Sequence, residues 1–264
     1  MQAPKGPLGV TPGAAGGSRG GVAGAIPLNA VRQRTSRELL NVSWDYPVYV
    51  SAAESADVGG NYSRAKTPRK ALPLDKAYYE ISQTDQRPLL VLRECDSCEG
   101  TDDALLSTRF DNEKTMLKAQ WFHLVKLPTH VTDDSHPFHN LFGEQEMPHL
   151  FLASHDGTKV VPLDGGQSQT DLWRAMDDVL EHAYLPDHER SLKKQLKLLD
   201  ALDGLDEEEN RLAADLDNVI EKKGPKSPKA KSLRKKLEKV RGEREEALTA
   251  RDDVASLKLK PADD

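Results

Sequence analysis

Two cysteines lie close together in the segment PLLVLRECDSCEG, which spans residues 88–100. They are Cys95 and Cys98, and the chain has no other cysteine. A bridge between cysteines at this spacing closes almost no loop, so it would add little stability. If the two sulfurs form a disulfide, we expect the reason to be redox chemistry. In such chemistry one thiolate attacks a disulfide and a second thiol releases the product.

The residues on both sides of the pair predict a strand that leads into a helix. Residues 89–93 (LLVLR) form a continuous apolar run of strand length, as in buried parallel strands. Residues 97–110 are expected to form the helix. Unpaired N–H groups and the dipole at a helix start stabilise the thiolate of the first cysteine. The second cysteine lies about one turn further on, within reach of a mixed disulfide.

The wider pattern predicts a mixed α/β fold. A short helix is expected before the cysteines, and strands, a hairpin and a closing helix after them. The expected elements are a helix at 74–85, strands at 89–93, 118–127, 148–154 and 159–163, and a helix from Ser168 to about His182. Ser168 and Asp171 match a capping box in spacing. Strands that alternate with helices, followed by a hairpin, imply a mixed central sheet covered on both faces.

The composition changes on both sides of this region. Residues 1–35 are dominated by Gly, Pro and Ala without periodicity, which predicts a disordered tail. Residues 36–70 are expected to form an N-terminal extension that Trp44, Tyr46 and Tyr49 dock on the following domain.

Residues 188–258 are rich in Leu, Lys, Glu and Asp, in two periodic stretches around a Gly-Pro break. This pattern predicts an antiparallel helical hairpin of coiled-coil type. The seam is imperfect, because Glu209, Arg244 and Arg251 fall on it. Self-association or a partner helix is therefore expected to help bury its leucines.

Residues 71–185 resemble the thioredoxin family. The matching pieces are PLLVLRECDSC, the strand end LVKL, and EMPHLFLASHDGTKVVPLDG. The resemblance implies a thioredoxin-like mixed sheet flanked by helices, with the cysteine pair facing a cis-proline that opens the next strand. Pro148 falls at the position of that proline.

The resemblance also implies roles for individual residues. Cys95 would be the attacking thiol and Cys98 the resolving thiol. Pro148 would shape the substrate groove, and Met147 would offer its backbone to a bound peptide. Lys126 falls near the position of a family lysine that helps tune the thiols.

The chain departs from the family's pattern around the cysteines. The family usually has Trp before the first cysteine and Gly-Pro between the two, where this chain has Glu94, Asp96 and Ser97. Carboxylates beside the thiols disfavour the thiolate. The family's buried acid, six residues before the first cysteine, is Leu89 here.

These residues predict a thiol–disulfide oxidoreductase that acts on protein disulfides and exchanges electrons with a reductase or a partner thiol protein. No metal or organic cofactor is expected. The alternative is a non-catalytic thioredoxin-fold adaptor assembled through its coiled coil. Metal binding is a third interpretation, with His136 and His139 as candidate ligands, but structural zinc takes four ligands and the chain has no second Cys-x-x-Cys.

The charge pattern bears on partners. The net charge of −6 gives no general reason to expect nucleic acid. No apolar run approaches the length of a membrane span, so none is expected. As written, the chain predicts a cytoplasmic protein, or an exported one if the true start lies upstream. Residues 222–236 hold eight Lys or Arg and no acid. They predict a solvated helical tip or, alternatively, a docking site for an acidic partner, membrane or nucleic acid.

Overall fold

The structure is a computed structural model that describes residues 32–48, 70–94, 105, 112–142, 149–163 and 166–261. Among these residues a four-stranded sheet has the strand order β2-β1-β3-β4. The strands are β1 (Leu89–Arg93), β2 (His123–Leu127), β3 (Leu150–Ala153) and β4 (Val160–Leu163). β1 runs parallel to β2 and antiparallel to β3, and β3 runs antiparallel to β4. The predicted mixed sheet is confirmed.

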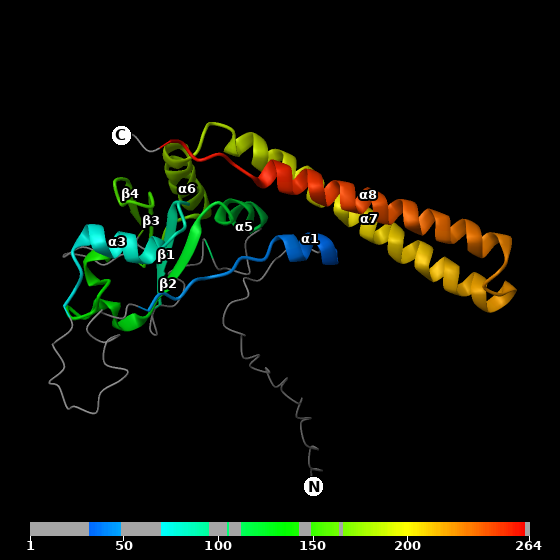
Figure 1. Cartoon of the computed structure of the whole chain (residues 1–264), viewed down its shortest axis with the longest axis horizontal. Coiled ribbons are helices and arrows are strands. Elements are labelled where there is room, and N and C mark those ends of the chain that lie inside the picture. Colours follow the sequence, from blue (N-terminus) through cyan, green and yellow to red (C-terminus); the bar gives the residue numbers. More distant parts are fainter. Residues whose placement is uncertain are drawn as a thin grey trace, which may run out of the picture.

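Helices cover both faces of the sheet (Figure 1). They are α3 (Leu74–Ser82), α5 (Glu113–Ala119), α6 (Gln169–Ala183) and the 3-10 helices η2 (Thr129–Thr132) and η3 (His139–Phe142). Successive side chains of a strand point to opposite faces. Leu90 and Leu92 of β1 therefore lie in one buried cluster with α5 and α6. Leu89 and Val91 lie in a second cluster with α3 and η3.

Local sequence signals set where α6 begins and where the chain turns between β3 and β4. Ser168 caps α6, because its side chain accepts a hydrogen bond from the backbone N–H of Asp171. Gly157 turns the chain between β3 and β4 with a φ of 73°. A β-carbon there would lie 2.4 Å from the ring of Tyr78, so the turn requires glycine for its conformation and for space.

The strand predicted at 118–127 is wrong in its first part. Lys118 and Ala119 end α5, and the strand begins only at His123. Trp121 and Phe122 are buried in the turn between the two elements. A short apolar run does not by itself distinguish the end of a buried helix from the start of a buried strand. Lys118 is buried because its ammonium pairs with Asp177 of α6.

The N-terminal extension lies against both the sheet and the C-terminal helices. Its short helix α1 (Arg34–Leu39) packs on α7, and Ser36 donates a hydrogen bond to the carbonyl of Leu199 at 3.0 Å. Further on, Asp45 forms a parallel bridge with Val125 beside β2. Trp44 packs against the core as predicted. Tyr46 does not, since 52% of its surface is exposed, and Tyr49 lies outside the described residues.

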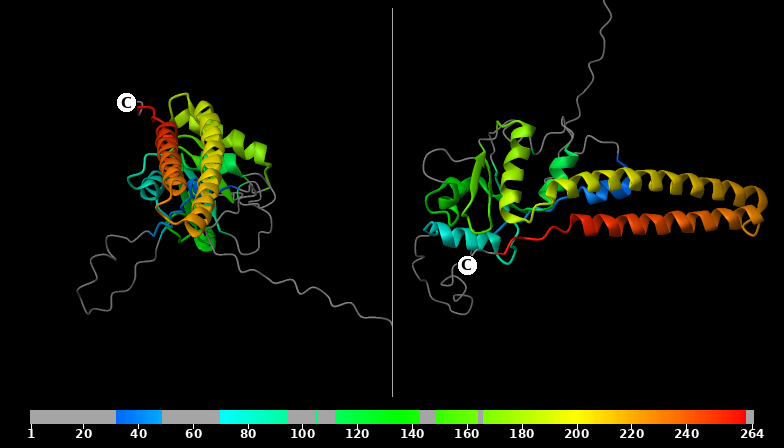
Figure 2. Two further views of the ribbon diagram at one scale, coloured as in Figure 1. Left: turned by 90° about the vertical axis from the view of Figure 1, so that its right-hand side faces the viewer. Right: turned by 90° about the horizontal axis from the view of Figure 1, so that it is seen from above.

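Two long helices, α7 (His188–Lys223) and α8 (Pro228–Ala255), lie side by side and project from the sheet as an arm (Figures 1 and 2). They run antiparallel around a short turn at Gly224. The apolar side chains between them are buried: Leu212, Val219, Ala230, Leu233, Leu237 and Val240. One chain therefore buries these seam residues by itself.

Two of the three polar residues that interrupt the seam, Glu209 and Arg244, contact each other across the arm, whereas Arg251 donates to the side chain of Gln120. Glu209 of α7 binds Arg244 of α8 at 2.5 Å and Arg241 at 2.6 Å. Asp206 lies 3.7 Å from the same Arg244 guanidinium. Because a polar pair in an apolar seam is satisfied in one alignment only, these contacts favour a single register of the two helices.

Both helices of the arm are anchored at its base on the sheet region. Leu192 and Leu199 at the start of α7 belong to the buried cluster that includes Leu90. At the end of α8, the carbonyl of Ala255 accepts a hydrogen bond from the indole N–H of Trp121 at 2.8 Å. The base of the arm and the sheet therefore share one core.

Candidate functional site

Five of the seven residues predicted for the redox site lie outside the described part of the chain. They are Cys95, Asp96, Cys98, Met147 and Pro148. The helix predicted at 97–110 also lies outside it, except for Leu105, which is helical. The residues that flank these segments are described, and they fix where each segment leaves the sheet.

The antiparallel pairing of β1 with β3 places the end of β1 beside the start of β3. Leu92 of β1 pairs with Leu150 of β3. One residue further on, the backbone N–H of Arg93 donates to the carbonyl of His149 at 2.7 Å. Cys95 follows Arg93 by two residues, and Pro148 immediately precedes His149. The chain that enters the cysteine motif therefore lies beside the chain that leaves Pro148.

The remaining two predicted residues, Glu94 and Lys126, line the same hollow at the carboxyl ends of β1 and β2. The hollow has a volume of about 340 Å³. The backbone N–H of Glu94 donates to the carbonyl of Leu127 at 2.9 Å, which extends the pairing of the two strands past Arg93. The ammonium of Lys126 lies 5.1 Å from the centre of the Trp44 ring, a cation–π distance. Glu94 and Lys126 thus line the same hollow, together with a second acid, Asp133.

The other walls of this hollow come from segments distant in sequence. Tyr46 and Val48 of the N-terminal extension form one side, and Pro128, His136 and Phe138 form the other. Tyr46 and Val48 are largely exposed. The only sequence signal for this wall is the run of strand-like residues in the N-terminal extension. That run does not indicate that the extension contacts the loop after β2.

The histidines of that loop do not gather into a metal site in the described residues. The rings of His130 and His136 lie edge to face, with centres 5.0 Å apart. His139 instead faces the carbonyl of Val131 at 3.3 Å and Asp134 at 3.5 Å. No group of three candidate ligands occurs in the part of the chain that the structure describes.

His149 is a titratable residue beside the end of β1 that the sequence does not single out. Its Nε2 lies 3.4 Å from the guanidinium of Arg93. Burial lowers the pKa of His149, and the neighbouring Arg93 cation lowers it further. The imidazole is therefore neutral at neutral pH. Its position directly after Pro148 was the available signal.

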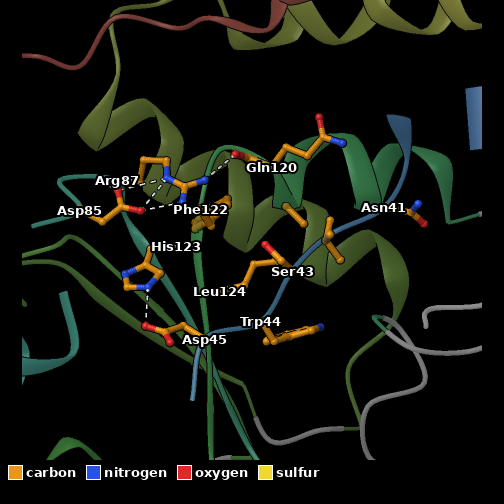
Figure 3. A pocket seen from close by; sticks show the side chains of 12 residues that line it. Asn41, Ser43, Trp44, Asp45, Asp85, Arg87, Gln120, Phe122, His123 and Leu124 are labelled. Carbon is orange, nitrogen blue, oxygen red and sulfur yellow. Dashed lines mark hydrogen bonds and ion pairs between the residues drawn. The ribbon is translucent and has the colours of Figure 1, made fainter. Parts of the chain in front are cut away.

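A second hollow, of about 420 Å³, lies at the other end of β1 and β2 (Figure 3). Its charged groups contact one another. Arg87 forms hydrogen bonds of 2.6 and 2.9 Å with Asp85, and His123 lies 3.4 Å from Asp45. Burial alone would raise the pKa of Asp85, but the hydrogen bonds from Arg87 outweigh it and lower the pKa. Because these polar groups contact one another, the hollow has the features of a structural network.

No helix in the described residues has the length and apolar character needed to cross a bilayer. Comparisons with models of protein families, with curated proteins and with solved structures found no match to the chain.

Proposed function

We propose that this chain is a thioredoxin-like thiol–disulfide oxidoreductase that acts on protein disulfides through Cys95 and Cys98. The observation that carries the proposal is the hydrogen bond from Arg93 to His149, with the β1–β3 pairing beside it. In the thioredoxin family a proline that opens a strand faces the cysteine pair. Here Arg93, two residues before Cys95, and His149, directly after Pro148, lie side by side.

The surrounding fold supports the same proposal. β1 is a central, buried strand of a mixed sheet covered on both faces, and the cysteine motif begins two residues after its end. Active residues commonly lie on loops that a rigid scaffold positions. The strand provides such a scaffold, because all its residues before Arg93 are buried.

The proposed reaction passes two electrons to the substrate. The Cys95 thiolate attacks one sulfur of a protein disulfide, and the other sulfur leaves as a thiolate that takes up a proton. The Cys98 thiolate then attacks the Cys95 sulfur of the mixed disulfide and releases the second substrate thiol. The Cys95–Cys98 disulfide that remains is reduced by a reductase or a partner thiol protein. The reverse sequence oxidises a substrate dithiol.

The described neighbours would tune the first cysteine in opposite directions. The carboxylate of Glu94, which is adjacent to Cys95 in sequence, would disfavour a thiolate there. The ammonium of Lys126, which lines the same hollow as Glu94, would favour one. The balance of these two charges, together with Asp96, would set the reactivity of the pair.

The arm favours a second candidate function, a thioredoxin-fold adaptor without exchange chemistry. The α7–α8 pair projects well beyond the sheet and has a polar contact in its seam, as a coiled-coil arm would. In the adaptor, partners would bind the sheet region or the arm without any sulfur exchange.

A trapping experiment separates the two functions. In Cys98→Ser the resolving thiol is absent, so a mixed disulfide between Cys95 and its substrate should accumulate and disappear on addition of reductant. The matched control is Cys95→Ser, which keeps one thiol in the same motif but should trap nothing. If Cys98→Ser traps no partner, or if both variants trap the same proteins equally, the oxidoreductase proposal is wrong.

A further inference from the structure

A dense group of cations lies at the far end of the arm. It consists of the eight Lys and Arg residues of 222–236, which we call the basic tip, and all eight side chains are exposed. Glu221 and Glu238 mark its two limits in the sequence. Arg234 donates a hydrogen bond to the carbonyl of Pro225 at 2.9 Å, which holds its guanidinium over the turn. In the described part of the chain, the seven lysines of the tip form no ion pair with an acid.

The cations surround the tip instead of following one face. α7 ends at Lys223, and α8 begins at Pro228 after a short turn. On α8 the buried seam is held by Ala230, Leu233 and Leu237. The lysines and the arginine between these positions point away from the seam. They therefore lie on all sides of the helix except the side that faces α7. The tip is therefore a cationic knob and not a one-sided basic face.

The arm separates this knob from an acidic body. Residues 1–187, which precede the arm, together carry −7, and the rest of the arm, 188–221 and 237–255, carries another −7. α7 rises about 1.5 Å per residue, which places the tip about 50 Å from the start of the helix at His188. That distance is several times the Debye length of about 8 Å at physiological salt. An extended anionic surface at the tip would attract the knob and barely repel the body.

We propose that the basic tip binds an anionic lipid bilayer surface, with the arm holding the sheet region away from the membrane. Clusters of four to eight basic residues bind anionic leaflets through charge alone. The tip also lacks, within the described residues, the exposed large apolar side chains that would insert into the bilayer. Binding is therefore peripheral and salt-dependent.

The composition of the tip favours a lipid surface over nucleic acid. Seven of its eight cations are lysines, which act as hydrated point charges, whereas planar recognition of phosphate favours arginine. The tip holds no aromatic residue on which a base could stack. A diffuse array of lysines on a knob suits a plane of negative headgroups.

The test is co-sedimentation of the full chain with vesicles of phosphatidylcholine, alone or with about 30% phosphatidylserine, at about 0.1 M salt. Each cation near an anionic leaflet contributes about a factor of five in affinity. The tip variant Lys226→Glu, Lys229→Glu, Lys235→Glu should therefore bind at least about 100-fold more weakly. The matched control reverses three exposed lysines at the base of the arm, in Lys193→Glu, Lys194→Glu, Lys197→Glu. It changes the net charge equally and should lose no more than about threefold.

Several outcomes would overturn the proposal. The wild-type chain might not sediment with the anionic vesicles, it might bind neutral vesicles equally well, or the base and tip variants might lose binding equally. Tighter binding to duplex DNA than to the vesicles at equal anionic charge would assign the tip to nucleic acid instead. Circular dichroism of both variants shows whether the arm remains helical. The outcome is independent of the redox proposal, because Cys95→Ser should bind the vesicles like the wild type.

Discussion

The contact between Glu209 and Arg244 predicts a measurable coupling between the two helices of the arm. Glu209 is 16% exposed and Arg244 is 27% exposed, so both charges are largely withdrawn from water. Glu209 makes short contacts with Arg244 and with Arg241, at 2.5 and 2.6 Å. A hydrogen bond to a charged group contributes about 1.5–3 kcal/mol when it is partly buried. The Arg241 contact contributes less, because that side chain is 61% exposed.

We therefore expect Glu209→Ala to lower the free energy of unfolding by about 2–3 kcal/mol, with part of the loss due to the unpaired Arg244 charge. In a double-mutant cycle with Arg244→Ala the coupling energy should be about 1–2 kcal/mol. Urea unfolding followed by circular dichroism at the helical band measures all four proteins.

The control is an exposed ion pair within α8. Lys239 and Glu243 lie 3.1 Å apart, but their side chains are 76% and 43% exposed. Their coupling should not exceed about 0.5 kcal/mol. A coupling between Glu209 and Arg244 as small as that of this pair would refute the view that the interrupted seam is closed by a specific polar contact.

Three further predictions concern stability. Gly157→Ala should lower the free energy of unfolding by about 3 kcal/mol, because φ is positive there and the new methyl group meets the Tyr78 ring; a thermal melt measures it. Burial would raise the pKa of Asp156, but hydrogen bonds from Ser154 and the turn lower it to about 2. Since the charged form is the stabilising one, the loss of about 1 kcal/mol in Asp156→Asn at pH 7 should shrink as the pH falls from about 4 to 2 in urea titrations. Leu237→Ala should cost about 2 kcal/mol at any protein concentration; a loss that grows on dilution would instead indicate a seam shared between two chains.

The elements that the sequence predicted well are those with strong local signals. β1 is a continuous apolar run that begins directly after Pro88, and its bounds at 89–93 are confirmed. The hairpin follows from Asp156-Gly157 between two apolar runs. The start of α6 follows from its Ser168 cap. In each case the signal lies within a few residues of the feature that it predicts.

The features that the sequence did not predict depend on contacts between distant segments. The hollow beside Glu94 joins the N-terminal extension to the loop after β2, and no local pattern links Tyr46 to His136. The start of β2 was placed too early, because Lys118 is buried by an ion pair with Asp177, which lies on another helix. Glu209 and Arg244 each looked like a defect in an apolar seam, and each is the partner of the other.

The most direct test of the central claim is a redox titration of the Cys95–Cys98 pair against a thiol buffer, read by alkylation and mass. The account predicts a single two-electron transition at a potential between about −270 and −120 mV, the range of thioredoxin-fold redox pairs. It also predicts that Cys95→Ser abolishes the transition. If no disulfide forms across that range, or if both thiols alkylate near pH 7 at the rate of a free peptide cysteine, the pair is not a redox centre.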